Sequence, residues 1–193
     1  MEFRSVMGSH HLIQPIGYGL VRKIRRRGAP VHSAREQFLI HQEVYEFRSP
    51  ILFIPKPVSQ EGDGYTMEEF VAYSVLPSDC IGMVPALVAE LRRLRDFLVP
   101  RGVYPLGFAI LLIHPESVEG WERPCTSKDP LYGLIDVSRF CSVQGNVVSV
   151  PKIGYIRRCD ADLVFERYIT LPTSLTERVA TEKTTALSRD DEV

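Results

Sequence analysis

The clearest hydrophobic pattern in the chain predicts a long amphipathic helix near its middle. Within residues 82–102, large apolar residues recur every three or four positions and charged residues occupy most of the positions between them. Pro100 and Gly102 follow the last apolar positions and mark the end of this helix. A weaker helical pattern covers residues 34–47, directly after Ser33, which is suited to cap it. A short third helix is predicted over residues 160–169.

Shorter apolar runs, separated by glycine, proline and polar residues, predict β-strands. They occupy residues 3–9, 11–16, 20–26, 51–57, 65–75, 108–113 and 131–140, with one more within 145–155. The turn sequence QEGDG joins two of them as a hairpin. The segment 114–130 is polar and long enough to be an inserted loop. The fold class predicted from this order is α+β.

The same order predicts two lobes and a tail. Residues 1–75 form a small β-rich lobe with one helix, and residues 76–172 form a helical lobe that contains a buried pair of strands. Residues 173–193 are polar and rich in threonine. We expect removal of this tail to cost less than about 1 kcal/mol of stability, as for a surface segment.

Composition and charge narrow the function classes. The formal net charge is -1, which gives no overall field that would favour nucleic acid or an anionic membrane. The four cysteines include no CxxC pair, so we expect free thiols and no zinc. No segment is long and apolar enough for a signal peptide or a membrane span, so we expect a soluble, cytoplasmic protein without a membrane partner.

The segment LYGLIDVSRF carries a carboxylate in an apolar setting. Leu134 and Ile135 precede Asp136, and Val137 follows it, so the strand around this residue is predicted to be buried. A buried carboxylate without a partner is costly, so Asp136 should meet hydrogen-bond donors, a cation or water in a cleft. Lys23 is one candidate partner. The alternative is that Asp136 only caps a turn after the strand.

Five motifs in succession resemble the protein-kinase-like superfamily, in particular aminoglycoside-phosphotransferase relatives and small bacterial kinase-like proteins. LVRKIRR resembles the third strand of the small lobe, and EQFLIHQEVYEF followed by IPKP resembles its helix and the next strand. YTMEEFV resembles the strand before the hinge, ALVAELRRLRDFLVPRGV the long helix of the large lobe, and GLIDVSRF the metal-binding segment. The resemblance covers roughly residues 12–170 and implies a minimal two-lobed kinase-like fold. Only 57 residues follow Asp136 (193 minus 136), so the C-terminal lobe would be truncated.

The resemblance also implies a site for ATP and Mg²⁺. Lys23 would contact the nucleotide phosphates, Glu43 would hold Lys23 in place, with Glu36 as its rival, and Asp136 would bind Mg²⁺. The residues that would line the adenine side are Met67, Glu68 and Phe70. If Gly17-Tyr18-Gly19 were the glycine-rich loop instead of Gly8-Ser9, LVRKIRR would be the second strand and Lys23 would lose this role.

The segment RGVYPLGFAILLI departs from the family at the position of the catalytic loop. That loop requires an Asp and an Asn, whereas this segment contains no Asp, Asn or His. We therefore predict a pseudokinase that acts through an unknown protein partner or a small-molecule ligand. One alternative is an atypical small-molecule phosphotransferase that uses ATP and Mg²⁺ with an acid borrowed from Asp160 or Asp162. The other is a nucleic-acid-binding module that uses the basic run from Arg22 to Arg27, which the net charge disfavours.

Overall fold

The computed structural model describes residues 6–7, 11–28, 31–69, 72–113, 131–134 and 136–170. The helices of this part of the chain are α1 (Ala34–Tyr45), η1 (Ser78–Met83), α2 (Pro85–Leu98), η2 (Val99–Arg101) and α3 (Arg158–Thr170), where η marks a 3-10 helix. Its strands are β1 (Val6–Met7), β2 (His11–Gly17), β3 (Leu20–Arg25), β4 (Leu52–Phe53), β5 (Pro57–Glu61), β6 (Gly64–Glu68), β7 (Ala72–Leu76), β8 (Val103–Pro105), β9 (Ile110–Ile113), β10 (Leu131–Leu134), β11 (Phe140–Gln144), β12 (Val147–Val150) and β13 (Gly154–Arg157).

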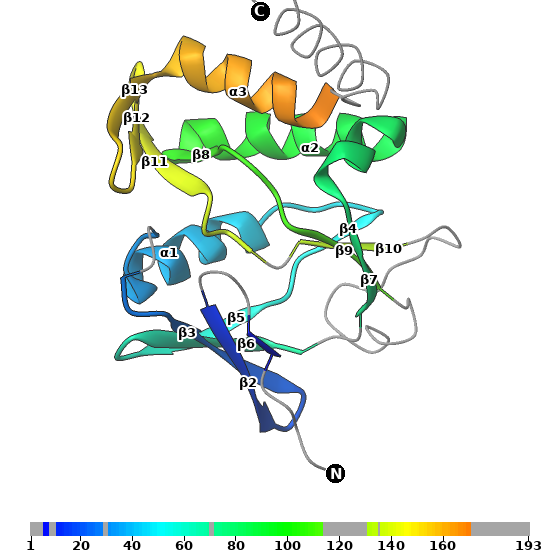
Figure 1. Ribbon diagram of the computed structural model, residues 1–193, viewed down its shortest axis with the longest axis vertical. Helices are drawn as coiled ribbons and strands as arrows, with labels where there is room; N and C mark the ends of the chain where they lie inside the picture. Colours follow the sequence, from blue (N-terminus) through cyan, green and yellow to red (C-terminus); the bar gives the residue numbers. More distant parts are fainter. Residues whose placement is uncertain are drawn as a thin grey trace, which may run out of the picture.

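The first sheet has the order β1-β2-β3-β6-β5, and its neighbouring strands are antiparallel. Helix α1 packs against β5 and β6, and we call this sheet with α1 the small lobe (Figure 1, bottom). Gly17-Tyr18-Gly19 connects β2 to β3, where Tyr18 has a φ of 55°. Among the described strands, the one that carries Lys23 is the third, which is the register that its predicted role requires.

The second sheet connects the two halves of the sequence. Its order is β4-β10-β9-β7, and β4 and β10 run parallel while the other pairs are antiparallel. The prediction of one continuous strand over residues 65–75 was wrong, because β6 pairs in the first sheet and β7 in the second. The predicted strand 131–140 is divided in the same way: β10 belongs to the second sheet and β11 to the third.

The third sheet has the order β13-β12-β11-β8 and is entirely antiparallel. Together with α2 and α3 it forms what we call the large lobe (Figure 1, top). The predicted helices over residues 34–47, 82–102 and 160–169 correspond to α1, α2 and α3. Ser33 caps α1 as expected, because its hydroxyl accepts from the Glu36 backbone and the Glu36 carboxylate accepts from the Ser33 backbone.

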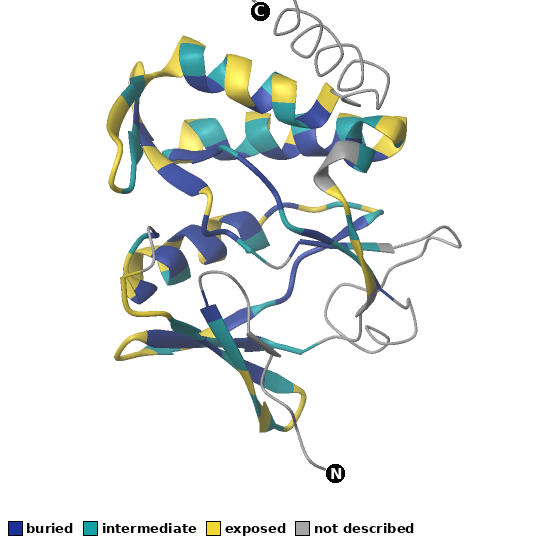
Figure 2. Ribbon diagram, viewed as in Figure 1, coloured by how far each residue is buried: buried dark blue, intermediate teal, exposed yellow. Residues whose placement is uncertain are grey.

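The main hydrophobic core is centred on α2 and reaches both lobes (Figure 2). The predicted apolar stripe of α2 is confirmed by Leu87, Leu91, Leu94 and Leu98, none of which has exposed surface. These leucines share one cluster with buried side chains of α1 and α3. None of the described helices is long and apolar enough to cross a membrane.

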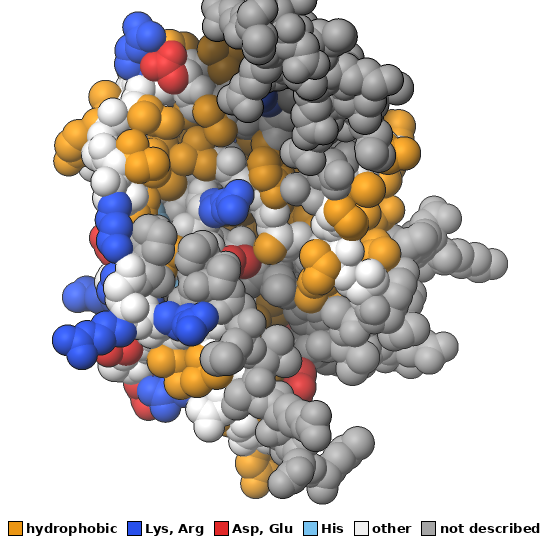
Figure 3. All heavy atoms as spheres, viewed as in Figure 1, with side chains coloured by type: hydrophobic (Ala, Val, Ile, Leu, Met, Phe, Trp, Pro, Cys, Tyr) orange, Lys and Arg blue, Asp and Glu red, His pale blue; other side chains and the backbone are white. Residues whose placement is uncertain are grey.

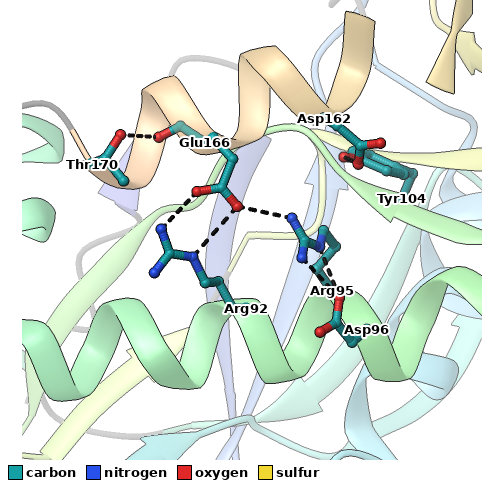
Figure 4. Close-up of polar contacts among 7 residues, drawn as sticks. All are labelled: Arg92, Arg95, Asp96, Tyr104, Asp162, Glu166 and Thr170. Carbon is teal, nitrogen blue, oxygen red and sulfur yellow. Dashed lines mark hydrogen bonds and ion pairs between the residues drawn. The ribbon is translucent and has the colours of Figure 1, made fainter. Parts of the chain in front are cut away.

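Polar contacts on the outer side of this core connect α2 to α3 (Figure 4). The guanidinium groups of Arg92 and Arg95 donate to the carboxylate of Glu166, with nitrogen-to-oxygen distances of 2.7 and 3.0 Å. Near the start of α3, a residue of β8 makes a further contact: the Tyr104 hydroxyl donates to Oδ1 of Asp162 at 2.5 Å. The two helices are thus held together by apolar packing inside and ion pairs outside.

Candidate functional site

A buried ion pair joins the small lobe to the segment between β10 and β11. Alternation along β3 buries Val21 and Lys23 on one face, so that Lys23 is only 3% exposed. Its Nζ atom lies 2.7 Å from Oδ1 of Asp136, whose side chain is 25% exposed. The two residues are 113 positions apart in the sequence. The prediction that Asp136 meets a partner, with Lys23 as the candidate, is confirmed.

The turn that follows Asp136 supplies two further hydrogen bonds to its carboxylate. The backbone N–H of Ser138 donates to Oδ1 at 3.0 Å, and the Ser138 hydroxyl donates to Oδ2 at 2.8 Å. Burial raises the pKa of Asp136, but the Lys23 ammonium and the bonds from Ser138 outweigh it and lower the pKa. Burial lowers the pKa of Lys23, but Tyr65 and Asp136 together raise it above its usual value. Both groups are therefore charged at neutral pH.

Two aromatic residues lie beside the ion pair. Nδ1 of His41, on α1, is 3.2 Å from the hydroxyl oxygen of Tyr65, on β6. Burial and the Lys23 ammonium lower the pKa of His41 to about 3, so its ring is neutral at physiological pH. The Lys23 Nζ atom is 5.9 Å from the centroid of the Tyr65 ring. We call these four residues (Lys23, His41, Tyr65 and Asp136) the interlobe site.

The predicted ion pair between Lys23 and Glu43 is wrong. The Glu43 side chain is 48% exposed, and its carboxylate lies 4.0 Å from Nε of Arg101. Glu36 and Glu43 are seven positions apart, which is nearly two helical turns, so both acids lie on the outward face of α1. The inward face instead carries Gln37, His41 and Val44. A neutral imidazole thus stands near Lys23 where a carboxylate was expected, and Asp136 supplies the negative charge.

The residues predicted to line the adenine side have other contacts in the small lobe. Met67 is buried against Val21 and Tyr65. The Glu68 carboxylate accepts a hydrogen bond from the Lys56 backbone N–H at 2.8 Å. Phe70 lies outside the described residues, as does the Gly8-Ser9 loop. Whether this strand end contacts a nucleotide stays a prediction.

Hydrophobic side chains pack around the connection between β8 and β9, the segment where the sequence resemblance places a catalytic loop. Its residues are Leu106, Gly107, Phe108 and Ala109, and none carries a group that accepts a proton. The Phe108 ring is 5% exposed and packs against the rings of Phe140, Phe165 and Tyr168. The Tyr168 hydroxyl also donates to the Phe108 carbonyl at 2.6 Å. An aromatic cluster thus surrounds this connection.

The acids that an active enzyme was expected to borrow are bound elsewhere. Asp160 pairs with Arg157 at 2.9 Å on the exposed start of α3. Asp162 accepts from Tyr104 and lines a surface hollow of about 410 Å³ with neighbours that include Arg158. Neither carboxylate contacts Lys23 or Asp136.

The basic run from Arg22 to Arg27 does not form a single exposed strand face. Arg22 and Lys23 lie on opposite faces of β3, and the Arg22 guanidinium donates to the Glu61 carbonyl at 3.3 Å. Arg26 and Arg27 follow the end of the strand. The arrangement that a nucleic-acid-binding strand would present is therefore not formed.

The interlobe site offers a magnesium ion a single carboxylate, that of Asp136. Magnesium requires several oxygen ligands in near-octahedral geometry. Within the described ranges, no three His, Cys, Asp or Glu side chains come together. Both oxygens of Asp136 already accept hydrogen bonds, and one of them accepts from an ammonium group. A magnesium ion here would take one oxygen from Asp136 and the rest from ligand phosphates and water, so the role of Asp136 as its ligand stays a prediction.

A comparison with solved structures identifies the fold. The chain is similar to the Rio2 kinase of Chaetomium thermophilum, solved as an ADP/Mg²⁺-phosphoaspartate complex, with a TM-score of 0.54 and 21% sequence identity. The match covers 91% of this chain and 54% of that kinase, so this chain spans about half the length of its structural neighbour. No protein-family model matches the sequence, and no curated protein matches it significantly. The α+β fold is kinase-like, as the sequence motifs indicated.

Proposed function

We propose that this chain is a pseudokinase, a kinase-like protein that binds a ligand or a protein partner without transferring phosphate. The observation that carries this proposal is the connection between β8 and β9. Phe108 is buried there among aromatic rings, and its carbonyl is bonded to Tyr168. Phosphoryl transfer in kinases depends on an acid that orients the acceptor hydroxyl, and no residue of this connection supplies one.

The remaining polar groups support binding rather than catalysis. Lys23 and Asp136 neutralise each other at 2.7 Å, and the neighbouring His41 is neutral. A positioned acid or base contributes a factor of about 10² to 10⁴ in rate, which this site does not provide. The structural neighbour holds ADP, so we propose a nucleotide or a similar phosphate-bearing molecule as the ligand class. We also propose that the protein binds this ligand in the cytoplasm.

Phosphoryl transfer can be measured directly. We expect no transfer when the protein is incubated with γ-labelled ATP, Mg²⁺ and generic protein or small-molecule acceptors. The matched control is Asp136→Ala, which should give the same background as the parent protein. Transfer by the parent that this substitution abolishes would establish an atypical phosphotransferase and overturn the proposal.

A further inference from the structure

The turn after Asp136 presents an arginine at the protein surface. The backbone N–H of Phe140 donates to the Val137 carbonyl, which closes a turn with Ser138 and Arg139 at its centre. The Arg139 carbonyl accepts from the backbone N–H of Leu106, so the arginine is anchored to the connection between β8 and β9. The Arg139 side chain is exposed, and within the described part of the chain its guanidinium has neither an ion pair nor a hydrogen bond.

The direction of the Arg139 side chain depends on a glycine. A Cβ atom at Gly107 would lie 2.9 Å from Cδ and 3.4 Å from Nη1 of Arg139. The arginine stem therefore crosses the backbone of Gly107, in the connection between β8 and β9. The backbone of Gly107 needs no positive φ, so the requirement for glycine here is one of space.

Among the residues that the structure describes, no acidic side chain pairs with Arg139, whereas several other charged groups are paired. Asp136 is neutralised by Lys23, and Glu166 and Asp160 are paired within the large lobe. Asp136 reaches the solvent with a quarter of its side-chain surface, and Arg139 lies three residues further along the same turn. On the face drawn in Figure 3, basic side-chain atoms lie beside acidic ones in the middle of the molecule, between the two lobes.

We propose that Arg139 binds the phosphate group of a ligand in the interlobe site, and that this binding requires no divalent metal ion. A guanidinium presents a planar fork of donors that matches two phosphate oxygens and is always charged. It can therefore supply the positive charge that a metal ion supplies elsewhere, and Asp136 is already committed to Lys23 and Ser138. This inference rests on the proposed ligand-binding function and adds to it the residue that anchors the phosphate group and the independence of this binding from a metal ion.

Calorimetric titration of the full chain tests this proposal, with ADP, pyrophosphate and adenosine as probes, each in EDTA and in Mg²⁺. We expect the parent protein to bind ADP with similar affinity in both buffers. Arg139→Ala should weaken the binding of ADP and pyrophosphate about tenfold or more, as expected for loss of a charge-assisted bidentate contact. The affinity for adenosine should not change. Arg35→Ala, which removes an exposed arginine from α1, is the matched control and should behave as the parent.

Two further variants separate the guanidinium from general effects on folding. Arg139→Lys keeps the charge and the stem but loses the fork, so it should lose only part of the affinity for ADP. Gly107→Ala keeps Arg139 but displaces its stem, so it should also weaken ADP binding at an unchanged melting temperature. ADP binding that needs Mg²⁺, or equal affinity of Arg139→Ala and the parent, would overturn the proposal. Absence of any ADP binding would overturn it too, yet would leave the pseudokinase proposal standing, because that concerns phosphate transfer.

Discussion

Two regions of the molecule are shielded from solvent but bury different kinds of side chain. One is the inner face of α2 in the large lobe, and the other lies between β3 and α1 in the small lobe. In α2 four of the five buried positions are leucines with no exposed surface, such as Leu91 and Leu94, and the fifth is Glu90, which accepts a hydrogen bond from Arg93. In the small lobe, Gln37 and His41 are also fully buried and Lys23 is 3% exposed. Stability in the first region depends on filled volume, whereas in the second it depends on each polar atom having a partner.

The largest effect should come from a cavity in the apolar region. Leu94→Ala should lower the free energy of unfolding by about 2–5 kcal/mol, because the side chain is fully buried in the shared core. Denaturant unfolding measures this loss. Leu163→Ala is the matched control on α3, where the leucine is 71% exposed, and should change stability by less than about 0.5 kcal/mol. Equal effects of the two variants would contradict the assigned core.

Breaking the buried ion pair should cost somewhat less. Lys23→Met leaves the Asp136 carboxylate with the two Ser138 donors but no cation, and we expect a loss of about 1–3 kcal/mol, reduced because Asp136 is partly solvated. The double variant Lys23→Met/Asp136→Asn should be more stable than Lys23→Met alone, since it removes the unpaired charge. A double-mutant cycle tests the coupling, and strictly additive losses would show that the contact carries no energy.

The neutral histidine predicts a dependence of stability on pH. The pKa of His41 is lowered to about 3 in the folded protein, so between pH 6.5 and 3 the unfolded chain binds more protons than the folded one. Stability should therefore fall with acidification by about 1 kcal/mol per pH unit below 6.5. The lowered pKa of Asp136 adds a loss only at lower pH, below its unfolded value.

The variant His41→Asn isolates this effect, because it keeps a polar side chain but does not titrate. Its unfolding free energy should change less between pH 7 and pH 5 than that of the parent. The partly buried His32 also has a lowered pKa and should leave a smaller residual slope of the same sign. An unchanged slope in the variant would show that His41 does not provide the pH dependence.

The smallest effect should come from the ion pairs between α2 and α3. Glu166→Gln removes the charge that Arg92 and Arg95 share, but the Arg92 and Glu166 side chains are 43% and 38% exposed. Exposed pairs contribute little, so we expect a loss of less than about 1 kcal/mol, decreasing further at high salt. Thermal unfolding at low and high salt measures it. A loss as large as that of Leu94→Ala would mean that these helices depend on charge rather than on packing.

Elements with a strong local signal were predicted correctly. The stripe of α2 and the Ser33 cap depend on neighbours three or four positions apart, and the sequence displays these directly. The pairing of Lys23 with Asp136 could also be predicted, because a buried carboxylate requires a partner and the resemblance to kinases placed Lys23 in the same site.

Two predictions failed because they depend on the orientation of α1 and on the pairing of strands far apart in the sequence. Glu43 was chosen because it lies deep in the helix, whereas the buried spacing of Gln37, His41 and Val44 places it outward. The spacing of these three residues was the usable signal, because it indicates which face of α1 is buried. The division of residues 65–75 into β6 and β7 follows from two different partner strands, which no local pattern displays.

The parallel pairing of β4 with β10 has a consequence for how the chain folds during synthesis. Leu52 is in register with Tyr132, a separation of 80 residues (132 minus 52). At ordinary translation rates the ribosome needs about 4–16 s to make that interval, and during this time β4 has no strand to pair with. Both residues of β4, Leu52 and Phe53, are apolar, so the nascent chain exposes an unpaired, aggregation-prone strand edge until β10 is made. The second sheet is therefore completed only after β10 has left the ribosome.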